Sequence, residues 1–189
     1  MFASSGGAVN ALALVARHPG DVRRLVAHEP PLASMLPDRE AAMKATEAVN
    51  RTYMERGSNY GMAHFIASVS HSGEFPADWA DQPGPDPQMF GMPTTDDGSR
   101  TDVLLAQNMI SCTHYEPDFD ALRQAPTRIV MAAGAEAGTM ANRGAHAVAQ
   151  RLGSQAVAFP GGHAGFLGGE FGQQGEPDAF AAKLHEVID

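Results

Sequence analysis

The stretch ASSGGAVNALALVARHP, residues 3–19, decides how the beginning of the chain is interpreted. Small residues come first, and an apolar pattern with helical spacing follows from residue 8 to residue 18, where Pro19 and Gly20 end it. Residues 22–27 then predict a short strand. The chain therefore opens with a turn, a helix and a strand, which is half of a βαβ unit.

The same order of elements returns near the other end of the chain. Residues 128–133 predict a buried strand and residues 156–159 another short strand, and residues 139–152 and 177–188 predict helices. Strands that alternate with helices favour an α/β fold, in which a parallel, open sheet is flanked by helices on both faces.

Residues 32–125 interrupt this alternation. Helical patterns cover 40–55, 61–70 and 100–111, and a proline-rich, irregular stretch lies between 76 and 97. We expect this block to be a mostly helical cap inserted over the sheet edge, within a single domain that spans residues 1–189.

Composition excludes several classes of protein. The 189 residues carry 13 basic and 22 acidic side chains, a net charge of −9, which argues against a nucleic-acid surface. One cysteine, Cys112, excludes an internal disulfide framework and a cysteine-based zinc site. No apolar run reaches the roughly 18 residues that a membrane span needs. We expect a cytoplasmic protein that binds a small-molecule substrate and needs no metal or other cofactor.

The residues before the first helix suggest a catalytic nucleophile. Ser5 has Ala3 two positions before it and Gly7 two positions after it. This spacing is typical of a sharp strand-to-helix turn that presents a serine hydroxyl at the carboxyl edge of a sheet. Gly6 would then supply a backbone N–H to a developing oxyanion. The alternative for these residues alone is an ordinary loop.

A histidine and an acid complete the candidate site. His163 lies in the glycine-rich loop FPGGHAGF, residues 159–166, after the last predicted strand. Glu136 is the only acid in the loop GAEAG, residues 134–138, after the strand before it. The order Ser5, Glu136, His163 is that of a Ser-acid-His triad on a parallel sheet. Glu29, at the end of the strand over 22–27, is the rival for the acid.

These segments together resemble the α/β-hydrolase family, in its branch of small hydrolases with a helical cap. The matching stretches are SSGGAVNALALVARHP, RRLVAHEPPL, RIVMAAGAE and FPGGHAGF, which lie at the two ends of the chain. The resemblance implies that Ser5 attacks an acyl carbonyl, that His163 acts as base and then as acid, and that water releases the acyl-enzyme. It implies a small ester or a related acyl compound as the substrate.

The chain departs from this family before the turn at Ser5, where the strands and helices that begin the family's core are missing. We therefore expect a truncated core of three parallel strands, with an exposed sheet edge through which two copies could pair. Two alternatives remain open. The same triad could cleave a C–C bond or carry out cofactor-free peroxidation, or the chain could be an inactive fragment that serves as a binding module.

Overall fold

A parallel sheet forms the base of the molecule in the computed structural model, which describes residues 1–135 and 138–188. Within these residues the sheet has four strands, in the order β1 (Phe2–Ser4), β2 (Arg24–His28), β3 (Arg128–Gly134) and β4 (Val157–Phe159). All neighbouring strands are parallel, and the α/β class is confirmed. The expected number of three strands is wrong, because Phe2–Ser4 pairs in register with Val26–His28.

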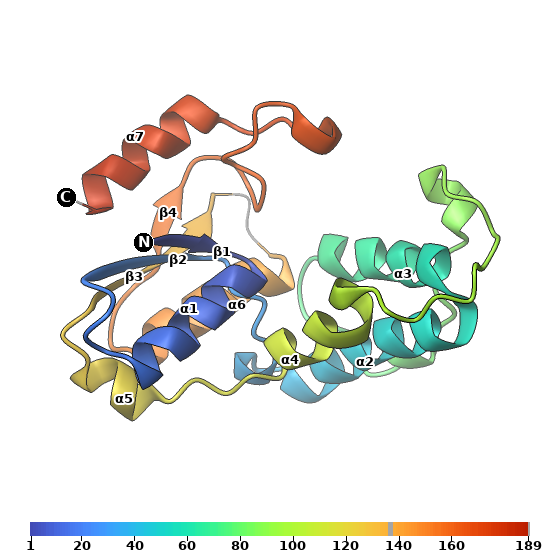
Figure 1. Ribbon diagram of the computed structural model, residues 1–189, viewed down its shortest axis with the longest axis horizontal. Coiled ribbons are helices and arrows are strands. Elements are labelled where there is room, and N and C mark those ends of the chain that lie inside the picture. Colours follow the sequence, from blue (N-terminus) through green and yellow to red (C-terminus); the bar gives the residue numbers. More distant parts are fainter. Residues whose placement is uncertain (136–137, 189) are drawn as a thin grey trace.

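Helices cover both faces of this sheet (Figure 1). On one face lie α1 (Gly6–Arg17), α5 (Phe119–Gln124) and α6 (Met140–Arg151), and on the other lies α7 (Pro177–Ile188). Successive strand residues alternate between the faces: Leu25 and Ala27 pack toward α1, while Val26 packs toward α7. None of the helices in the described part of the chain combines the length and the apolar character needed to cross a membrane.

A helical layer lies between β2 and β3 in the sequence and beside the sheet in space (Figure 1). We call α2 (Arg39–Arg56), α3 (Ser58–Ser70), the π-helix η4 (Leu104–Asn108) and α4 (Met109–Thr113) the cap. Within the described residues, four short 3₁₀ helices lie in connecting segments. Three lie between β2 and β3, namely η1 (Ala33–Met35), η2 (Trp79–Asp81) and η3 (Pro87–Phe90), and η5 (Glu170–Gly172) follows β4. Although α5 precedes β3, it packs in the sheet's own core against α1.

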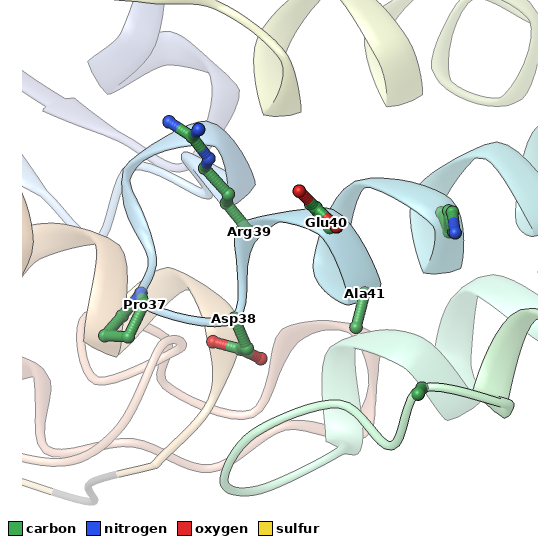
Figure 2. A pocket seen from close by; sticks show the side chains of 7 residues that line it. Pro37, Asp38, Arg39, Glu40 and Ala41 are labelled. Carbon is green, nitrogen blue, oxygen red and sulfur yellow. The ribbon is translucent and has the colours of Figure 1, made fainter.

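An ion pair at the start of α2 connects the cap to α6, one of the helices that cover the sheet. Asp38 pairs with Arg143 of α6, and the Arg143 guanidinium also donates to the carbonyl of Gly73 at 2.7 Å. Figure 2 shows Asp38 and Arg39 pointing to opposite sides of the backbone at this place. Burial alone would raise the pKa of Asp38, but the Arg143 pair and the N–H of Phe75 outweigh it and lower that pKa. The ion pair therefore ties the first helix of the cap to α6.

The close contact of α6 with the chain after β2 gives a test of this packing. A Cβ on Gly144 would lie 2.3 Å from the backbone oxygen of Pro30, so we expect Gly144→Ala to lower the free energy of unfolding by about 1–3 kcal/mol. On an unobstructed helix the same change would stabilise by up to about 1 kcal/mol. Gly20→Ala, which meets no atom within 4 Å, is the matched control. Urea unfolding checks both, and a Gly144→Ala variant as stable as the control would contradict this packing.

Candidate active site

Ser5 lies at the junction between β1 and α1 in a strained backbone conformation. Its φ of 56° and ψ of −132° are rare for a residue with a side chain. The Ser5 N–H donates to the carbonyl of His28 at 2.9 Å, which keeps Ser5 next to the sheet, and the Ala8 N–H donates to the carbonyl of Ser5, which begins the helix. The turn therefore holds Ser5 at the carboxyl edge of the sheet, as its sequence pattern predicts.

Gly6 follows Ser5 as the first residue of α1. Backbone N–H groups in a first helical turn have no intrahelical acceptor, so those of Gly6 and Gly7 are suited to bind negative charge. Both glycines line the same cavity as Ser5. A Cβ on Gly6 would come within 3.3 Å of the Cys112 sulfur. A side chain at Gly6 would thus be tight against α4.

His163 forms a hydrogen bond with Glu29, which follows β2. The His163 Nδ1 and Glu29 Oε2 atoms lie 2.7 Å apart. The His163 side chain is 44% exposed, whereas that of Glu29 is 1% exposed, so the pair runs from the surface into the core. Glu136, the predicted acid, lies outside the described residues. The acid that the described structure joins to His163 is therefore the rival, Glu29.

The other carboxylate oxygen of Glu29 also accepts hydrogen bonds. Oε1 accepts from the Gly134 N–H at 2.8 Å and from Asn142 Nδ2 at 2.9 Å. Burial alone would raise the pKa of Glu29, but the hydrogen bonds from His163, Asn142 and Gly134 outweigh it and hold that pKa below its ordinary value. Glu29 is thus a buried, ionised carboxylate. It also has a positive φ of 46°, which fixes the direction in which its side chain leaves β2.

Sequence reasoning missed Asn142 and Gly134 as parts of this site. Gly134 is the last residue of β3. A Cβ there would lie 2.8 Å from the carbonyl oxygen of Gly161, in the loop of residues 159–166 that carries His163 and that we call the histidine loop. Asn142 lies in the first turn of α6 and also donates to the Gly134 carbonyl. A glycine that ends a buried strand and an amide in the next helical turn are weak signals, since both are common at strand-to-helix connections.

A cavity of about 680 Å³ lies between the sheet edge and the cap, and Ser5 and His163 both line it. The cap contributes apolar side chains to the cavity, and α6 contributes its first turn. None of the described residues that line the cavity is Asp, Glu, Lys or Arg. The described lining includes Phe65, Val69, Leu104, Met109, Met140, Asn10 and Asn108. A second cavity, of about 330 Å³, lies around Pro37–Ala41 (Figure 2), and neither Ser5 nor His163 lines it.

His28 is a fully buried histidine directly before Glu29. Burial lowers the pKa of His28 from 6.5 to about 4, the Glu29 carboxylate opposes this shift, and His163 adds to it. Among the described residues its Nε2 has no hydrogen-bond partner. The His28 ring is therefore neutral at pH 7.

The low pKa of His28 predicts that the fold is acid-sensitive. Between pH 6.5 and about 4 the unfolded chain takes up a proton that the folded chain does not, so stability falls as the pH falls through this window. The expected loss is about 3 kcal/mol, at roughly 1.4 kcal/mol per pKa unit. Urea unfolding at several pH values measures it. His28→Gln, which cannot titrate, should lose distinctly less over the same window, and equal losses would contradict the prediction.

Comparisons with known proteins identify no relative of this chain. No family model matches the chain, and no curated protein and no solved structure matches it either. The interpretation of the site therefore depends on its own residues.

Proposed function

We propose that this chain is a serine hydrolase of the α/β-hydrolase class, in the branch of small hydrolases with a helical cap, and that it cleaves a small, neutral ester. Ser5 is the nucleophile, His163 the general base and acid, and Glu29 the acid that orients His163. The observation that carries the proposal is the pair formed by the ionised, buried Glu29 and the exposed His163, at the rim of the cavity that Ser5 lines.

The positions of these residues in the sheet support the proposal. Ser5 follows β1, Glu29 follows β2 and His163 follows β4, so all three come from the carboxyl edge of one parallel sheet. Ligands of open α/β sheets bind at this edge. The strained backbone of Ser5 also fits a nucleophile, since such strain is kept at sites where it serves a function.

The first half of the proposed reaction uses the pair of Glu29 and His163 together with Ser5, which lines the same cavity as His163. The His163 Nδ1 atom is engaged by Glu29, which leaves Nε2 to take the proton of the Ser5 hydroxyl. The Ser5 oxygen then forms a bond to the substrate carbonyl carbon, and the negative charge that develops on the carbonyl oxygen is met by N–H groups of the first turn of α1. When the C–O bond to the leaving alcohol breaks, His163 returns its proton to that alcohol.

The second half repeats these steps with water as the nucleophile and Ser5 as the leaving group. His163 takes a proton from water, the hydroxide oxygen bonds to the acyl carbon, and the bond to Ser5 breaks as His163 returns the proton to the serine oxygen. The product is the free carboxylic acid. The neutral character of the substrate is supported by the cavity, whose described lining carries no Asp, Glu, Lys or Arg that could compensate a charged group.

The proposal is tested by hydrolysis of p-nitrophenyl butyrate, a neutral activated ester. We expect turnover by the purified chain and a loss of about 10³-fold or more in kcat with His163→Ala, because the serine then lacks its base. His146→Ala, on the outer part of α6, is the matched control. A chain that unfolds cooperatively yet gives no hydrolysis above the buffer rate would refute the proposal.

A further inference from the structure

His28 joins the two strands that carry Ser5 and Glu29. Its Nδ1 atom lies 3.0 Å from the Ser4 Oγ atom, and the two residues are register partners across β1 and β2. The His28 carbonyl also accepts from the Ser5 N–H at 2.9 Å. Both the side chain and the backbone of His28 therefore hold the end of β1 at the point where the chain turns into α1.

The ring of His28 also faces the ring of His163. The two ring centroids lie 6.0 Å apart with 27° between the planes, in a stacked arrangement. The His163 ring thus has two neighbours here, Glu29, which is hydrogen-bonded to its Nδ1 atom, and the stacked ring of His28. Glu29 is the residue that follows His28, so the hydrogen bond and the stacking contact both come from the end of β2.

Aromatic side chains from four other places enclose the His28 ring. They are Phe2 of β1, Phe159 of β4, Phe166 of the histidine loop and Phe180 of α7, with centroids 5.3–6.2 Å away. The charged or titratable groups that act on His28 are Glu29 and His163. Burial disfavours the protonated ring more than the neighbouring Glu29 carboxylate favours it, so His28 is neutral at pH 7 and does not repel a protonated His163.

We propose that His28 is the positioning residue of this site, and that it holds the Ser5 turn through Ser4 and the His163 ring by stacking. The inference rests on the proposed hydrolase function. A histidine suits the role because it combines a flat, neutral ring with a nitrogen that can bond a hydroxyl. Leucine has neither property, phenylalanine has only the ring, and glutamine has only the hydrogen-bonding group.

The test compares His28→Leu, His28→Gln and His28→Phe by kcat and KM for p-nitrophenyl butyrate. We expect His28→Leu to lower kcat about 100-fold, as misplacement of catalytic groups by about 1 Å does, with KM within about twofold. His28→Gln and His28→Phe should each recover part of this loss. Should His28→Leu fail to fold, the other two variants still decide the question, and thermal unfolding confirms that each is folded at the assay temperature.

A double-mutant cycle separates positioning from a general effect on folding. If His28 acts through the Glu29–His163 pair, His28→Gln should cost less than about threefold in kcat when Glu29→Gln is already present. An equal loss in both backgrounds, or an unchanged kcat in all three single variants, would overturn the inference. Absence of hydrolysis by the wild-type chain would instead refute the proposed function, so the two failures can be told apart.

Discussion

Ser5→Ala should lower kcat for p-nitrophenyl butyrate by about 10⁴-fold or more, which is the largest effect we expect from one substitution. The Ser5 oxygen is the atom that becomes acylated, and no other hydroxyl can take its place on the strained turn. What remains would be the modest acceleration that binding and oxyanion stabilisation give without a nucleophile. Steady-state kinetics measure the loss, with blanks that contain no protein to correct for spontaneous hydrolysis.

The neighbouring Ser4 provides the control for this prediction. Ser4→Ala removes a hydroxyl one residue away together with the bond to His28, so we expect a loss no larger than about tenfold. Comparable losses of kcat from Ser4→Ala and Ser5→Ala would contradict the assignment of the nucleophile.

The strained backbone of Ser5 also predicts an effect on stability. Ser5→Gly should raise the free energy of unfolding by about 1 kcal/mol, since glycine adopts a φ of 56° without strain.

Glu29→Gln should lower kcat by about 10³- to 10⁴-fold while the protein stays folded. The Gly134 N–H and Asn142 Nδ2 both donate to one oxygen of Glu29, so the carbonyl oxygen of a glutamine would take that place. Its NH₂ group would then face Nδ1 of His163 and donate to it. The His163 proton would be forced onto Nε2, which could no longer accept the proton of Ser5.

A parallel Glu136→Gln variant decides between the two candidate acids. We expect the large loss in kcat from Glu29→Gln and a much smaller one from Glu136→Gln, with circular dichroism to confirm that both variants are folded. The reverse result would assign the acid to Glu136 and would leave Glu29 as a buried structural carboxylate.

Much of the fold could be predicted because its elements are marked by local sequence signals. The helix over 139–152 and the strand over 128–133 correspond to α6 and β3 within one or two residues, since both combine a clear apolar period with a breaker at the end. The strand Phe2–Ser4 was missed because three residues carry no readable alternation, and its pairing depends on β2.

The acid of the site shows where local reasoning fails. Both Glu29 and Glu136 follow a predicted strand, and the sequence favours Glu136 because it lies on the loop after the strand that precedes the last one. The contact between Glu29 and His163 depends on a positive φ at Glu29 and on two donors, Gly134 and Asn142, that lie more than 100 residues away in the sequence. Neither property can be read from the residues around Glu29.

The most direct test of the central claim is covalent labelling by a fluorophosphonate probe, followed by peptide mapping of the adduct. A serine that is activated by His163 displaces fluoride from phosphorus and keeps the phosphonyl group. We expect one adduct, on Ser5, that disappears in Ser5→Ala, is slowed in His163→Ala and persists in Ser4→Ala. A folded wild-type chain that stays unlabelled, or that carries the adduct on another residue, would contradict the account.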